Sequence, residues 1–416
     1  MNLKLTNIKQ LVTISHELSH PASKLFRVGK EMSDLAIIEN AALVIENGII
    51  TFFGKMQDIP SNNYTEIDCS DKVVMPGFVD SHTHLLFAGS REEEFAMRSR
   101  GFTYQQIAEQ GGGILSTVYK TRAASKRELK KNARRYINKM MQYGTTTVEI
   151  KSGYGLSFDD EIKMLEAIKE LQKEEIITIS STFLGAHAIP PEYKNSPNQY
   201  VNLICDKIIP YVGEHKLAEF CDVFCEKGYF SVSDSEKILS TGISYGLKPK
   251  IHAEELTSYG GAILAGKLKA VSADHLENIS DEGIESMKAN GVVGVLLPGV
   301  SFFLNHNYAP ARKLIDSGVP VAIATDFNPG SCMSYSMPLM LTIACTQMRM
   351  SPEEAITAAT INAAAALNLS NEIGSIDIGK KGDVIILDIP NYKFLTYHFG
   401  ENHIYKVIKN GTYLEF

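Results

Sequence analysis

Short apolar runs alternate with amphipathic stretches through the middle of the chain. The runs are rich in β-branched and aromatic residues, as buried strands are, and lie at residues 73–84, 145–150, 176–187, 220–226, 248–255, 269–277, 291–299 and 319–330. Between them, apolar residues recur at helical spacing over 129–144, 159–174 and 280–291. This alternation predicts an α/β fold with a parallel sheet covered by helices, and the eight runs favour a TIM-like (β/α)8 barrel over an open sheet.

The two ends of the chain have a different pattern. Up to about residue 73, short strand-like runs are separated by turn signals such as Asn47-Gly48, and the same pattern returns from about residue 373 with Asn410-Gly411. We therefore expect residues 1–73 and 373–416 to build one small β domain together. The barrel would then occupy residues 74–372.

Composition narrows the classes of partner and compartment. A net charge of -7 would repel a phosphate backbone, so we expect no nucleic acid partner. The longest apolar stretch, 291–304, is shorter than a bilayer span and contains Pro298 and Gly299, and the start has no apolar signal-peptide core. Six cysteines without a CxxC pair indicate neither a disulfide framework nor a thiolate zinc site. We expect a cytoplasmic protein that does not bind membranes.

Histidines and an aspartate stand at the carboxyl ends of four expected strands. His82 and His84 end the first strand and point to one face, His252 ends the fifth, His275 the sixth and Asp326 the eighth. In a (β/α)8 barrel these ends form one rim, so the side chains would converge. A single histidine is more often an ordinary hydrogen-bonded residue. Together, three imidazoles and one carboxylate suit Zn or Fe(II) and leave a position open for catalysis.

Four segments resemble the strand-end motifs of the amidohydrolase superfamily, namely PGFVDSHTHLLFAG, IHAEE, SADH and ATDFNPG, and the resemblance covers essentially the whole chain. It implies a (β/α)8 barrel with a small β-sandwich built from both termini. It also implies that His82, His84, His252 and Asp326 bind metal, with His275 beside the reacting water or substrate. Binuclear members carry a carboxylated lysine on the fourth strand, but Lys227 lies beyond that strand's expected end. We therefore expect one Zn or Fe ion per subunit.

Further motifs resemble one family within that superfamily, the imidazolonepropionases: FAGSREEEF, GGGI, IKSGYGL, FLGAHAIPPEY, FCEKGYFS and DFNPGS. These enzymes are hydrolases of a cyclic carbon–nitrogen bond in histidine degradation, opening 4-imidazolone-5-propanoate to N-formimidoyl-L-glutamate. The resemblance implies a homodimer, and it implies that substrate is contacted by Arg91, Tyr104, Tyr154, His187, Glu255, Asn328, Gly330 and Ser331.

The expected catalytic groups are Glu255, His275 and Asp326. A bound metal lowers the pKa of water and so supplies a nucleophile near neutral pH. Asp326 could hold the proton of that water, and His275 could orient the water or stabilise the oxyanion. Glu255 would carry a proton to the leaving ring nitrogen. If the strand continues, Glu254 points to the opposite face, and the resemblance selects Glu255.

Simpler roles stay open for several of these residues. Arg91 could pair with Glu92–Glu94 on a solvated surface, Tyr154 could pack in a turn, and His187 could be structural. The Gly111–Gly113 run lacks the lysine of a phosphate-binding loop and favours a connector or lid.

Two other functions also stay open. One is a deaminase of a cyclic amidine or a purine or pyrimidine base, although such a base offers Arg91 no carboxylate. The other is a metal-stabilised barrel that binds a small molecule without catalysis.

Overall fold

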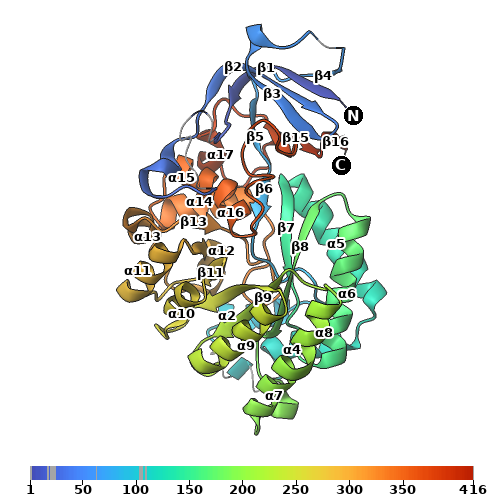
Figure 1. The fold of residues 1–416 in the computed structure, drawn as a ribbon, viewed down its shortest axis with the longest axis vertical. Coiled ribbons are helices and arrows are strands. Elements are labelled where there is room, and N and C mark those ends of the chain that lie inside the picture. Colours follow the sequence, from blue (N-terminus) through green and yellow to red (C-terminus); the bar gives the residue numbers. More distant parts are fainter. Residues whose placement is uncertain are drawn as a thin grey trace.

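The computed structural model describes residues 2–15, 18, 25–61, 63–102, 106–107 and 110–415. Its larger part is a barrel of parallel strands, and a second sheet built from both ends of the chain lies at one end of it (Figure 1). Among the described residues, no helix combines the length and apolar character needed to cross a membrane. All six cysteines are free.

The barrel contains all eight of the strands expected from the sequence. They pair in chain order, and a parallel bridge from Thr83 to Phe327 joins the segments after the first and last strands. This nearly closes the barrel. The strands are β6 (Phe78–Asp80), β7 (Thr145–Lys151), β8 (Thr178–Ala186), β9 (Phe220–Cys225), β10 (Lys248–Ala253), β11 (Ser272–His275), β12 (Val293–Leu296) and β13 (Val321–Ile323).

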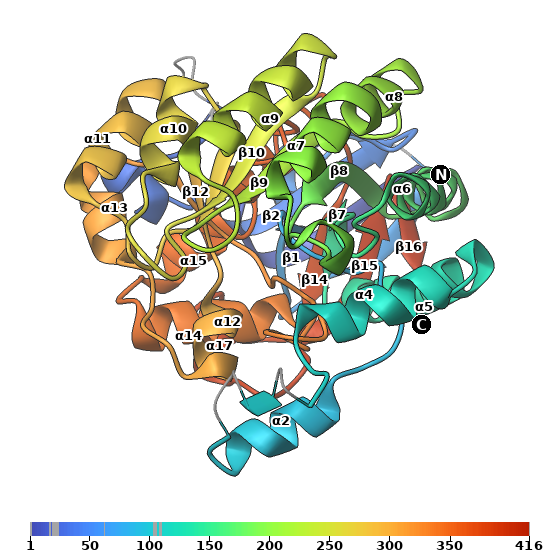
Figure 2. The same ribbon diagram turned by 90° about the horizontal axis from the view of Figure 1, so that it is seen from below.

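Helices run round the outside of these strands (Figure 2). In the helix over 126–142, Ser125 caps the first turn and the apolar residues Leu129, Ala133, Ile137 and Met140 are buried on one face. The α-helices are α2 (Glu92–Ser99), α4 (Ile114–Ala123), α5 (Lys126–Gln142), α6 (Phe158–Glu174), α7 (Pro197–Leu203), α8 (Ile209–Glu214), α9 (Val232–Ser244), α10 (Gly261–Lys267), α11 (Asp281–Asn290), α12 (Pro298–Leu304), α13 (Ala311–Ser317), α14 (Met337–Gln347), α15 (Pro352–Ala358), α16 (Ile361–Ala365) and α17 (Phe394–Tyr397).

The second sheet is mixed and combines strands from both termini. Its order is β16 (Thr412–Leu414), β15 (Ile404–Lys409), β14 (Val384–Leu387), β5 (Val73–Pro76), β1 (Leu3–Leu11), β2 (Ile38–Glu46) and β3 (Ile49–Lys55), with β4 (Thr65–Asp68) beside β1. It has an apolar core of its own, which includes Leu5, Leu43 and Ile386. Both Asn-Gly pairs have positive φ, at Asn47-Gly48 and Asn410-Gly411, as their hairpin turns require.

The first apolar run of the barrel differs from its expected form. Residues 73–84 form two strands, because β5 pairs with β1 and β14 while β6 pairs with β7. Gly77 separates them, and a Cβ there would lie 2.3 Å from the Thr146 side chain. Glycine therefore permits the close approach at which the chain passes from the terminal sheet into the barrel.

Candidate active site

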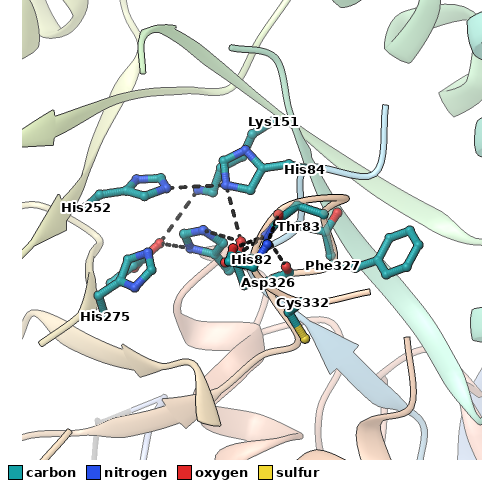
Figure 3. A network of polar contacts seen from close by, with 12 residues as sticks. His82, Thr83, His84, Lys151, His252, His275, Asp326, Phe327 and Cys332 are labelled. Carbon is teal, nitrogen blue, oxygen red and sulfur yellow. Dashed lines mark hydrogen bonds and ion pairs between the residues drawn. The ribbon is translucent and has the colours of Figure 1, made fainter. Parts of the chain in front are cut away.

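The structure brings the five strand-end residues together at one end of the barrel. His82 and His84 follow β6, His252 lies near the end of β10, His275 ends β11, and Asp326 follows β13. All five side chains are buried and face one another (Figure 3). The convergence expected from the barrel is therefore present.

The facing atoms are nitrogens and a carboxylate oxygen. His84 Nε2 lies 3.4 Å from His252 Nε2 and 3.3 Å from Asp326 Oδ1. His82 Nε2 lies 3.5 Å from the same oxygen, and ring nitrogens of the three histidines lie within 4.8 Å of one another. Donor atoms of these four residues thus surround one point.

These residues fit a transition-metal ion. Among the described residues, His82 Nε2 and Asp326 Oδ1 have no hydrogen-bond partner, although both are buried. Leaving such atoms unpaired is costly, and imidazole nitrogen with carboxylate oxygen is the donor set of catalytic Zn and Fe(II) sites. Lys227 is exposed, two residues beyond β9, and does not line this site.

Carboxylates lie behind two of the imidazoles. His82 Nδ1 lies 2.6 Å from Asp274 Oδ2, and His252 Nδ1 lies 3.0 Å from Asp222 Oδ2. A ring whose Nδ1 donates to a carboxylate presents Nε2 as a lone-pair donor, which is the usual arrangement behind metal-bound histidines. The sequence reasoning did not find these two aspartates.

A cavity of about 480 Å³ opens above the histidines. Its lining contains His84, His252, His275 and Asp326, whereas His82 lies deeper. It also contains every expected substrate contact that the structure describes, namely Arg91, Tyr154, His187, Glu255, Asn328, Gly330 and Ser331. Tyr104 lies outside the described residues.

Arg91 lies on the cavity wall, where it pairs with one residue of the acidic run. Its Nε and Nη2 donate to the two carboxylate oxygens of Glu94 at 2.9 and 2.7 Å, and both side chains are 13% exposed. A Cβ on Gly330 would lie 2.2 Å from Arg91 Nη1. The pair is therefore nearly buried, and the guanidinium packs directly against Gly330.

Glu254 and Glu255 have separate environments. Glu254 accepts hydrogen bonds from three backbone N–H groups where α10 begins, so it stabilises that turn. Glu255 lines the cavity, with Oε2 3.6 Å from His275 Nε2. Burial acts to lower the pKa of His275, but the carboxylates of Glu255 and Glu277 outweigh it and raise that pKa to about 10. Burial raises the pKa of Asp326 to about 7.

Asn328 and Ser331 form the turn that holds Asp326. Asn328 Nδ2 donates to Asp326 Oδ2 at 3.0 Å and to Ser331 Oγ at 2.7 Å. Asn328 Oδ1 accepts from the backbone N–H groups of Gly330 and Ser331. Much of the amide's hydrogen-bonding capacity is used inside the turn, so this residue helps to orient Asp326.

Tyr154 and His187 lie beside the metal-type histidines. The His187 ring stacks on His84 with centroids 4.8 Å apart, and His187 Nδ1 lies 3.1 Å from the carbonyl oxygen of Gly153. Tyr154 packs at 5.4 Å from the His187 ring. Both residues border the cavity and pack against other site residues there.

Several lining residues were missed by the sequence reasoning, namely Glu94, Arg98, Phe102, Tyr229, Leu304 and His306. Arg98 donates to the carbonyl oxygen of Gly330 at 3.1 Å and lies over the Phe303 ring at 5.0 Å. The spacing of Glu94 and Arg98 after Arg91, at one helical turn and two, is the signal that could have placed them on one face of α2.

Comparison with known proteins finds relatives of one family. Residues 73–414 match the model of the amidohydrolase family. A protein named imidazolonepropionase from Geobacillus sp. (strain WCH70) is 48% identical over 416 residues, which cover 98% of this chain and 97% of that protein. Another of that name, from Clostridium tetani (strain Massachusetts / E88), is 47% identical and covers 99% and 97%.

Solved structures share the fold at low identity. An adenosine deaminase from Xanthomonas campestris with bound zinc has a TM-score of 0.72 at 18% identity, covering 99% of this chain and 92% of that one. A 5-methylcytosine deaminase from Klebsiella pneumoniae has a TM-score of 0.74 at 15% identity, covering 99% and 97%. At such identities the likeness concerns the fold and not the substrate.

Proposed function

The chain belongs to the amidohydrolase family and, within it, to the imidazolonepropionases, and on this premise we propose that it hydrolyses the cyclic amide of 4-imidazolone-5-propanoate to N-formimidoyl-L-glutamate. One observation of the structure carries the proposal. The same cavity presents a cluster of metal-type donors at its base and the Arg91 guanidinium on its wall. In a ring amide with a carboxylate tail, the amide carbonyl would lie at the donor cluster and the carboxylate would pair with Arg91. An uncharged purine or pyrimidine base has no carboxylate to pair with the arginine.

We propose that His82, His84, His252 and Asp326 hold one Zn or Fe ion. Such an ion would supply a nucleophile at neutral pH by lowering the pKa of bound water to about 7, and it would polarise a carbonyl. The remaining steps belong to side chains of the cavity. Arg91 would bind the propionate through Nη1, which has no hydrogen-bond partner among the described residues, because Nε and Nη2 are already paired with Glu94.

Three groups would move or hold protons. Asp326, which lines the cavity, would take the first proton of the attacking water. Glu255 would take up the second proton of that water and deliver it to the ring nitrogen as the carbon–nitrogen bond breaks, since an unprotonated nitrogen anion is a poor leaving group. His275, 3.6 Å from Glu255, orients the water and donates to the developing oxyanion. The new carboxylate of the product forms where the carbonyl stood.

The proposed contacts with substrate also include Tyr154, His187, Tyr104, Gly330 and Ser331. Tyr154 and His187 border the cavity next to His84, and Gly330 gives Arg91 its space. We propose a structural role for Asn328 beside its contact role, because its amide holds Asp326.

Product analysis tests the proposal. The purified enzyme is offered imidazolone propionate, guanine and cytosine separately, and products are identified by mass spectrometry together with an ammonia assay. We expect N-formimidoyl-L-glutamate from the first compound and no ammonia from the other two. Ammonia release from either base, with no ring opening of imidazolone propionate, would make the chain a deaminase. No turnover of any of them by metal-loaded protein would favour a binding barrel.

The setting of the enzyme is part of the same proposal. We propose that it acts in the cytoplasm as a homodimer, with residues 1–73 and 373–416 forming the β domain and 74–372 the catalytic barrel. Light scattering coupled to size-exclusion chromatography would measure the mass of the assembly, and a monomer mass at micromolar concentration would contradict the dimer.

A further inference from the structure

Below the imidazoles, the barrel interior holds a group of charged side chains that the proposed chemistry does not use. We call it the basal charge cluster, and its side chains are all 0% exposed. They project from β7, β9, β10 and β11, and they are Glu149, Lys151, Asp222, Lys250 and Asp274.

Lys151 contacts three carboxylates of this cluster. Its Nζ lies 2.8 Å from Asp222 Oδ2, 2.9 Å from Glu149 Oε2 and 3.6 Å from Asp274 Oδ2. The contacts with the aspartates involve the same oxygens that lie beside the imidazoles. Asp222 Oδ2 is the atom next to His252 Nδ1, and Asp274 Oδ2 is the atom next to His82 Nδ1. One ammonium group therefore lies 2.8 and 3.6 Å from the two carboxylate oxygens beside the proposed metal ligands His252 and His82.

The charges of the site explain why an ammonium is needed here. The three carboxylates of the basal charge cluster exceed its two ammonium groups by one negative charge, and Asp326 adds another. Buried charges are tolerated only when they are paired. Without Lys151, the aspartates behind His82 and His252 would lose the cation that they share.

We propose that Lys151 is a positioning residue of the metal site, which holds Asp222 and Asp274 so that His252 and His82 both present Nε2 to the ion. The inference rests on the proposed function, because it requires that these histidines bind metal. Lys151 itself would touch neither metal nor substrate, since it does not line the cavity. Its effect would reach the ion only through the two aspartates.

Two other buried lysines provide matched controls. Lys250 belongs to the same cluster and lies 2.9 Å from Glu149 Oε1, but it is 3.9 Å from Asp274 and donates to the carbonyl oxygen of Ser81. Lys409 is 1% exposed and pairs with Asp383 in the terminal sheet, far along the chain from the site. Removing either one deletes a buried ammonium without deleting the link between Asp222 and Asp274.

The test is a measurement of metal affinity in the full-length enzyme. Lys151→Met, Lys250→Met and Lys409→Met proteins are stripped of metal and titrated with Co²⁺ against a competing chelator, and the visible ligand-field spectrum is recorded. Near-ultraviolet circular dichroism reports whether each variant is folded. Changes behind metal ligands typically weaken metal affinity by about 10- to 100-fold. We expect a loss of that size and an altered spectrum for Lys151→Met, a smaller loss for Lys250→Met and none for Lys409→Met.

A charge-balanced variant covers the case in which Lys151→Met does not fold. Lys151→Met/Glu149→Gln removes one charge of each sign and leaves both aspartates in place, with Glu149→Gln alone as its reference. We expect the double variant to fold and to bind Co²⁺ more weakly than this reference, with an altered spectrum.

Parent-like affinity and spectrum in a folded Lys151→Met protein would overturn the inference. So would a failure of both variants to fold, because Lys151 would then serve folding and not the metal site. A parent protein that binds no divalent metal would instead overturn the proposed function.

Discussion

Replacing Arg91 by methionine tests the match between the cavity and a carboxylate substrate. The guanidinium is 13% exposed and lies on the cavity wall, so its bond to a substrate carboxylate would be largely shielded from water. A hydrogen bond to a charged group contributes about 1.5 to 3 kcal/mol, which corresponds to a fall in kcat/KM of about 10- to 100-fold or more. Fold and metal content should be unchanged, because the side chain contacts neither the histidines nor Asp326.

The ion pair with Glu94 makes this prediction sharper. In Arg91→Met the Glu94 carboxylate loses both of its hydrogen bonds from Arg91 while facing the same cavity, so it would repel the propionate. Arg91→Met/Glu94→Gln should therefore recover part of the lost kcat/KM. The assay compares imidazolone propionate with an analogue that lacks the carboxylate, which should be a poor substrate for the parent and lose little more in the variant. Equal losses on both substrates would make Arg91 a structural residue and refute the argument from charge.

Other predictions address the proton path, the metal and the space beside Arg91. Glu255→Gln should lower kcat by about 10²- to 10⁴-fold with metal content unchanged, as expected for a general acid; near-normal turnover would remove Glu255 from the mechanism. Glu254→Gln is its control, and it should lower thermal stability, by about 1 kcal/mol for a weakened helix start, with little effect on kcat. Elemental analysis should find one metal per chain, and chelation should abolish turnover while the circular dichroism spectrum persists; two tightly bound metals, or full activity in chelated His84→Ala, would contradict this. Gly330→Ala should raise KM, because its new Cβ would displace the flexible end of Arg91 from its place on the cavity wall. The melting temperature should not fall. An unchanged KM would show that substrate binding does not depend on this position of Arg91.

The barrel and the cluster of histidines were accessible to sequence reasoning because both depend on local order. A strand has a side-chain period of two, and parallel strands end at one rim, so His82, His84 and His252 could be placed together before any coordinates. What the sequence could not provide was pairing across the barrel. Lys151 and Asp222 appear there only as charges inside two separate strands, and nothing local says that one of them binds the other.

The division of residues 73–84 into two strands was hidden for a similar reason. The apolar pattern is continuous through Gly77, and the break arises because the residues before it pair in the terminal sheet while those after it pair in the barrel. The role of Glu94 also depends on contact, since its neighbours Glu92 and Glu93 have the same charge. The spacing of three residues favours Glu94 as the partner of Arg91, but only the position of α2 places this pair on the cavity wall.

The backbone is strained at the ends of β11 and β13, where His275 and Asp326 enter the site. His275 and Asp326 have φ values of 79° and 49°, a left-handed conformation that non-glycine residues rarely adopt and that costs on the order of 1 to 3 kcal/mol each. Each turn is held by a bond to a neighbouring strand. The Asp326 N–H donates to the carbonyl oxygen of His82 at 3.0 Å, and the N–H of Leu276 donates to that of Ala253 at 3.0 Å. Because these bonds connect the strand ends to one another, the strain at each turn is supported by the barrel itself. The side chains of His275 and Asp326 thereby face His82, His84 and His252, around the point where we propose that the metal ion binds (Figure 3).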